Sequence, residues 1–261
     1  MVLAFGFTLL AGLSTTVGSL IAFLARETNR KFLSVSLGFS AGVMIYVSTI
    51  DIFPKAQALL SGALGMDTGS WLTAAAFFGG VLLIAVIDRV IPEDGNPHEV
   101  KWIQGDHGKQ PDKLMRMGLF SALALAIHNF PEGLATFVSA LQGPEIAIPI
   151  VTAIAIHNIP EGIAVSVPIY QATGSRRTAF RYSFLSGLAE PLGALIGWLI
   201  LMPIMNDVVY GVVFGAVAGI MVFISLDELL PSAQVFGEHH LAIYGLIAGM
   251  AVMAVSLLLF L

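Results

Sequence analysis

Long apolar blocks alternate along this chain with short clusters of charged residues, proline and glycine. Eight blocks can be separated, and most are close to twenty residues long. A helix of about twenty residues, rising ~1.5 Å per residue, crosses the ~30 Å hydrocarbon core of a bilayer. The pattern therefore predicts eight transmembrane helices, at residues 2–24, 33–53, 71–90, 117–141, 146–169, 182–202, 208–230 and 241–261.

The composition agrees with a membrane protein. Of the 261 residues, 57% are hydrophobic and 11% are charged, whereas soluble domains carry roughly 25% charged residues. That balance excludes a soluble globular protein. The first block lacks the basic start and the small-residue cleavage site of a signal peptide, so we expect it to be retained as a helix. The predicted fold is all-α and polytopic, with residues 1–261 forming a single transmembrane domain.

The basic residues predict which side of the membrane each connection faces. Eleven of the twelve lysines and arginines lie in the first, third and fifth connections, and Lys55 lies in the second. Because basic residues gather in cytoplasmic loops, the odd connections are expected inside and both termini outside. Since these basic residues are spread over several loops, they give no support to nucleic-acid binding.

The third connection, at about residues 91–116, is the only long polar stretch and is predicted to be a cytoplasmic loop. It holds several prolines and carboxylates together with His98 and His107. A solvated linker explains this composition. A loop that collects metal ions weakly, or that regulates the protein, is the alternative, because histidines and carboxylates are metal ligands.

The most informative stretch is a decapeptide that occurs twice. Residues 126–135 read AIHNFPEGLA and residues 155–164 read AIHNIPEGIA, with eight of ten positions identical. In a helix, His128 and Glu132 share a face because they are four residues apart, and Asn129 lies on the adjoining edge. The two copies together supply six candidate metal ligands: His128, Asn129, Glu132, His157, Asn158 and Glu161.

The residue types favour a borderline divalent ion. The chain has no cysteine, so any metal must be held by histidine, asparagine or carboxylates, which suit Zn²⁺, Fe²⁺, Mn²⁺, Co²⁺ or Cd²⁺. Pro131 and Pro160 each free a backbone carbonyl just before the histidine. The alternative is that both stretches only pack helices. Two duplicated pairs of ionisable groups, each costing at least ~2.5 kcal/mol near the bilayer centre, favour a metal site.

The direction of the helices adds a geometric prediction. The fourth and fifth predicted helices are antiparallel neighbours, so His128 should lie level with Glu161, and Glu132 with His157. We therefore expect two stacked levels, each with a histidine and a glutamate, and room for two neighbouring metal ions. The same reciprocity would follow from inverted, pseudo-two-fold symmetry about an axis in the membrane plane.

HNFPEG on the fourth helix and HNIPEG on the fifth resemble the motifs of the ZIP (Zrt-, Irt-like protein) family of divalent metal transporters. The doubled histidine is similar to the bacterial zinc-uptake branch. The resemblance covers essentially the whole chain. It implies uptake into the cytoplasm across the plasma (inner) membrane, and a binuclear site between helices four, five and six that includes Glu190. It also implies that helices one, four, five and six move against the other four.

Some relatives have Gln-Asp where this chain has His157 and Asn158, which leaves the metal preference open. Metal is expected as cargo, and no cofactor is expected.

Other candidate residues lie along the expected path of the metal ion. Asp51 could attract cations at the outer entrance or simply pair with Lys55. Asp227 and Glu228 are expected at the inner exit or as a solvated pair. Glycines repeated every four residues favour close helix packing and a homodimer.

Two other function classes were weighed. An intramembrane metal hydrolase would use a metal-activated water and a glutamate base, but the sequence shows neither HExxH nor a serine or cysteine nucleophile arrangement. A metal-permeable channel would share the ligands of a carrier and differ in its kinetics. The leading hypothesis is therefore a divalent metal uptake carrier, with zinc as the first candidate cargo and iron, manganese, cobalt or cadmium as the alternatives.

Overall fold

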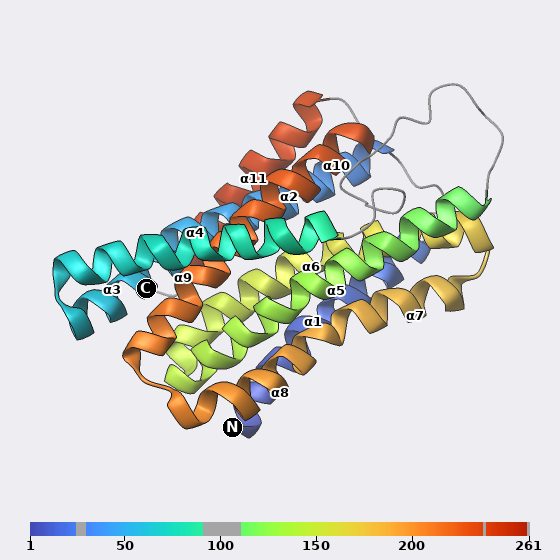
Figure 1. Cartoon of the computed structure of the whole chain (residues 1–261). Helices are drawn as coiled ribbons and strands as arrows, with labels where there is room; N and C mark the ends of the chain where they lie inside the picture. The colour runs from blue at the N-terminus through green and yellow to red at the C-terminus, as the bar shows by residue number, and fades with distance from the viewer. Residues whose placement is uncertain (25–29, 91–110, 237–238, 260–261) are drawn as a thin grey trace.

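The computed structural model describes residues 1–24, 30–90, 111–236 and 239–259, and every element within these ranges is a helix (Figure 1). In chain order they are α1 (Val2–Leu24), α2 (Arg30–Val47), the π-helical η1 (Ser48–Ile52), α3 (Phe53–Leu64), α4 (Met66–Val90), α5 (Pro111–Gln142), α6 (Pro144–Thr173), α7 (Arg176–Gly187), α8 (Ala189–Leu201), the 3-10 turn η3 (Met202–Ile204), α9 (Asp207–Ile224), the π-helical η4 (Ser225–Leu229), α10 (Leu230–Phe236) and α11 (His239–Leu259).

Seven helical stretches in the described residues are long and apolar enough to cross a membrane. Each overlaps one of the predicted blocks, so the chain is an all-helical polytopic membrane protein. The remaining block, 117–141, lies inside the 32-residue helix α5. Three predicted blocks are not single α-helices: the second and seventh contain π-helical segments, and the sixth breaks at Leu188 between α7 and α8.

Two predicted connections were wrong in their bounds. Lys55 lies inside α3, and only Gly65 separates α3 from α4, because a helix starting with Phe53-Pro54 tolerates proline in its first turn. Residues 111–116, which the sequence predicts as part of the long loop, form the start of α5. The rest of that loop, with His98 and His107, lies outside the described residues.

The helices form two groups that lie one above the other in Figure 1. In the lower group α1 packs against α5, α6, α7 and α8, and α5 packs against α6 and α8. In the upper group α2 packs against α10 and α11, while α9 packs against α3 and α4. The groups meet mainly where α2 contacts α6 and α5 contacts α9. This is the grouping of helices that the family resemblance implies.

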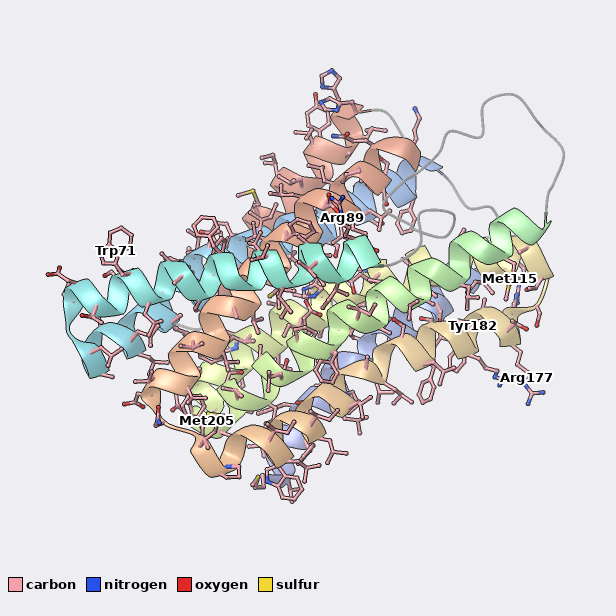
Figure 2. All side chains as sticks on the ribbon, viewed as in Figure 1. Trp71, Arg89, Met115, Arg177, Tyr182 and Met205 are labelled. Atoms are coloured by element: carbon pink, nitrogen blue, oxygen red, sulfur yellow. The ribbon has the colours of Figure 1, made fainter. Side chains whose placement is uncertain are left out.

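Polar and apolar residues are distributed as a bilayer requires. Trp71 on α4 is 79% exposed and points outward in Figure 2, as do many other large apolar side chains. The interior instead holds polar groups, with Glu132, His157, Glu161 and Glu190 all 0% exposed. Arg177 points away from the start of α7, at the end of the bundle where α5 also begins (Figure 2).

The regularly spaced glycines are confirmed as packing positions. A Cβ at Gly219 of α9 would overlap the carbonyl of Phe77 on α4, and one at Gly249 of α11 would overlap the carbonyl of Phe39 on α2. These glycines therefore bring helices of the same chain together. The predicted homodimer stays a prediction.

Candidate metal centre

Glu132 and His157 meet in the middle of the lower group. Glu132 Oε1 lies 3.0 Å from His157 Nε2, and both side chains are buried. The two residues come from the two copies of the decapeptide, on α5 and α6, which Gly143 connects in a tight turn. Glu132 and His157 therefore lie at the same level of the two antiparallel helices, as predicted. The other predicted level cannot be compared, since the side chain of His128 lies outside the described residues.

The two motif asparagines tie the neighbouring helices to this pair. Asn158 Nδ2 donates to the carbonyl of Ala11 on α1 at 3.0 Å and also contacts the carboxylate of Glu190. Asn129 Nδ2 donates to the carbonyl of Ser186 on α7 at 3.3 Å. Among the described residues neither Asn129 Oδ1 nor Asn158 Oδ1 has a hydrogen-bond partner. Each amide is thus anchored through nitrogen and leaves a buried oxygen available as a ligand.

The remaining candidate ligands are placed as follows. Glu161 is buried on α6, one turn after His157, and Glu190 is buried in the first turn of α8 beside Pro191. Among the side chains that the structure describes, no three His, Asp or Glu converge closely enough to hold a metal ion. The arrangement consists of the Glu132–His157 pair and the Asn158–Glu190 pair.

The glycines of the two motifs allow close helix crossings. A Cβ at Gly133 would overlap the carbonyl of Glu190, and one at Gly162 would overlap the carbonyl of Thr15. A side chain at either position would push α8 away from α5, or α1 away from α6. The glycine that follows each glutamate therefore sets the spacing between the motif helices and their neighbours.

Sequence reasoning missed a second internal repeat that surrounds this centre. Residues 10–24 and 185–199 are identical at seven of fifteen positions, including Gly12 with Gly187. These two glycines pack against each other's carbonyls, so α1 and α7 cross there. The repeat is visible in the sequence when LAGLSTTVGSLIAFL is aligned with LSGLAEPLGALIGWL. A search for metal-ligand motifs does not find it, because its identical residues are apolar or glycine.

A third repeat carries the expected path residues. Residues 41–57 and 218–234 are identical at seven of seventeen positions, and both contain Ser, an acidic residue and Pro at the same spacing. The π-helical segments η1 and η4 occupy matching positions of the two copies. Such π-helical turns inside α-helices are frequent at functional sites. Asp51 and Glu228 are equivalent residues of this repeat.

The structure also places the path residues individually. Lys55 Nζ lies 2.8 Å from both carboxylate oxygens of Asp51, so the predicted pair is present. Glu228 is 7% exposed, whereas Asp227 is partly exposed, and both lie in η4. In the third repeat the position of Lys55 is taken by Ser232.

Comparison with known proteins identifies the family of this chain. A family model described as ZIP Zinc transporter matches residues 88–257. A protein of Streptococcus mutans named Zinc transporter ZupT is 71% identical, over 98% of this chain and 97% of its own. Proteins of the same name from Oceanobacillus iheyensis and Lysinibacillus sphaericus are 65% and 62% identical, each over 99% of this chain and 98% of their own. The chain therefore belongs to the ZIP zinc transporter family.

Proposed function

We propose that this chain takes up divalent metal ions into the cytoplasm, with zinc as its preferred cargo. The observation that carries the proposal is the contact of Glu132 with His157, which joins the two copies of the motif inside a membrane protein of this family. The relatives described above are named zinc transporters. The same family membership makes the chain a transporter and not an enzyme.

The transported ions bind at two neighbouring positions between α5, α6 and the α7–α8 break. Histidine nitrogen and carboxylate oxygen are suitable ligands for zinc, and the unpartnered amide oxygens of Asn129 and Asn158 add neutral donors. An arriving ion would replace the Glu132–His157 contact by bonds to itself. The proposed ligands are His128, Asn129, Glu132, His157, Asn158, Glu161 and Glu190.

The chain crosses the membrane eight times as a single domain, with both termini outside and inverted symmetry. Matching contacts support this. Asn129 binds the α7 carbonyl of Ser186 just as Asn158 binds the α1 carbonyl of Ala11, and these residues are equivalent in the repeats. The upper group shows the same relation. Gly42 meets the carbonyl of Leu246, and its equivalent in the repeat, Gly219, meets the carbonyl of Phe77.

The lower helix group carries the ion and moves relative to the upper group, exposing the centre first outside and then inside. Asp51 lies on the outer part of the path, and Asp227 and Glu228 on the inner part. For a bacterial-type transporter the membrane is the inner (plasma) membrane.

The test is uptake of radiolabelled Zn²⁺ and Fe²⁺ into proteoliposomes. Wild type should show saturable uptake, and Glu132→Ala, Glu161→Ala and Glu190→Ala should each abolish most of it. Glu145→Ala is the matched control, because Glu145 is an exposed glutamate of α6. Full uptake by the three site variants would discard the site. Absence of uptake by wild type would discard the function, and unsaturable flux would indicate a channel.

A further inference from the structure

Thr15 of α1 is one of three buried threonines, with Thr16 and Thr136, whose hydroxyl has no hydrogen-bond partner among the described residues. Its side chain is 0% exposed. A threonine inside a helix commonly donates to the carbonyl four residues earlier, as Thr8 and Thr73 do here at 3.0 and 2.8 Å. Thr15 does not donate to the carbonyl of Ala11 in this way; that carbonyl accepts from the hydroxyl of Ser14 and from Nδ2 of Asn158 instead.

The second repeat gives this position a chemical counterpart. When residues 10–24 are aligned with 185–199, Thr15 falls opposite Glu190. The packing agrees with the alignment. A Cβ at Gly187 would lie 3.3 Å from Thr15 Cβ, and a Cβ at Gly12 would lie 3.4 Å from Glu190 Cβ. Thr15 therefore faces α7 as Glu190 faces α1.

The backbones of these two residues also have equivalent neighbours. The carbonyl of Thr15 lies against Gly162 of the second motif, and that of Glu190 lies against Gly133 of the first. On one side of the centre, Asn158 contacts the Glu190 carboxylate. On the other side, the equivalent residues are Asn129 and Thr15, and both have a buried oxygen without a partner in the described part of the chain.

We infer that Thr15 is a further binding position of the metal centre, supplying a neutral hydroxyl oxygen where the other half supplies the carboxylate of Glu190. A hydroxyl is a weaker ligand for a divalent ion than a carboxylate, because it carries no charge. The half of the centre that contains Thr15 therefore binds its ion more weakly, and the two ions differ in affinity. This inference rests on the proposed function, since it assumes the binuclear centre.

Transferring the carboxylate from position 190 to position 15 tests whether the two positions are equivalent. Equilibrium zinc binding is measured on purified protein in lipid nanodiscs. Glu190→Thr alone should weaken binding at least about tenfold, the loss typical for groups that support a metal site. Adding Thr15→Glu to Glu190→Thr should restore most of the affinity. Thr16→Glu with Glu190→Thr is the control, because Thr16 is the neighbouring buried threonine and aligns with Pro191; it should restore nothing.

Smaller changes keep the test valid if the glutamate variant fails to fold. Thr15→Val removes only the hydroxyl and should weaken the weaker zinc site about tenfold, whereas Thr15→Ser should preserve it. Thr16→Val should bind zinc as wild type does. Wild-type binding by Thr15→Val, or equal rescue by the two double variants, would overturn the inference. If Glu190→Thr itself binds zinc normally, the proposed centre fails, and the inference fails with it.

Discussion

Glu132 and His157 are twenty-five positions apart in sequence, yet Glu132 Oε1 lies 3.0 Å from His157 Nε2 in the buried interior. The contact joins two antiparallel helices, α5 and α6, through opposite ends of the repeated motif: the glutamate of the first copy and the histidine of the second. Buried ionisable groups are costly in a membrane and are retained chiefly where they serve a function. In the proposed metal centre, an arriving divalent ion would replace the contact between Glu132 and His157 by bonds to both side chains.

Exchanging the two residues should preserve the pair. Glu132→Gln and His157→Gln should each lower zinc affinity at least about tenfold, because each removes one ligand type. The double variant Glu132→His with His157→Glu returns one imidazole and one carboxylate to the same level and should recover part of the loss. Equilibrium zinc titration of the three variants checks this. A double variant whose zinc affinity is no higher than that of either single variant would contradict the direct pairing.

Zinc binding should weaken as the pH falls. The ligands must be a neutral imidazole and ionised carboxylates, so protons compete with the metal. For each proton that the metal must displace from the ligands, the affinity should fall about tenfold per pH unit. Equilibrium zinc binding, rather than zinc uptake, should be measured over a series of pH values. His157→Gln should show a shallower dependence, and an unchanged slope would exclude His157 as a ligand.

Asn158→Asp should make the protein depend on metal for stability. The substitution removes the amide that donates to Ala11 and contacts Glu190, and it places a second carboxylate beside Glu190. We expect a lower melting temperature without metal and a larger increase on adding zinc than wild type shows. Asn206→Asp, at the exposed N-cap of α9, is the control and should change neither value greatly. The same melting temperature in metal-free wild type and Asn158→Asp would argue against the observed contacts.

Gly162→Ala should disrupt transport through packing alone. The added Cβ would overlap the carbonyl of Thr15 and push α1 from α6. Overpacking of this kind typically costs about 1–3 kcal/mol, so both thermal stability and zinc uptake should fall. Gly6→Ala on α1 is the matched control, since a Cβ there meets nothing within 4 Å. A stable, active Gly162→Ala variant would show that the two helices do not pack as described.

Much of the fold could be predicted from the sequence because the bilayer imposes a simple rule on helix length and polarity. Seven of the eight predicted blocks coincide with membrane-length helical stretches, and the motif residues Glu132 and His157 meet as their spacing required. Proline positions such as Pro131 indicated where polar groups would gather. These features depend on local sequence and on the direction of two adjacent helices.

Other features depend on contacts between distant segments and could not be read from local patterns. The extension of the second block to Leu64 follows from packing of α3 against α4 and α9. The donation from Asn158 to Ala11 joins residues 147 positions apart. The equivalence of Thr15 and Glu190 was hidden because the two residues differ completely in charge, although the apolar positions around them correspond.

The most direct test of the account is the number of zinc ions bound per chain at saturation, measured by equilibrium binding of radiolabelled Zn²⁺ to purified protein in nanodiscs. Two ions of unequal affinity are expected for wild type, and the Glu132→Gln and Glu161→Gln variants should bind fewer ions or bind them much more weakly. A single ion per chain in wild type, or two ions unaffected by either variant, would contradict the two-level metal centre.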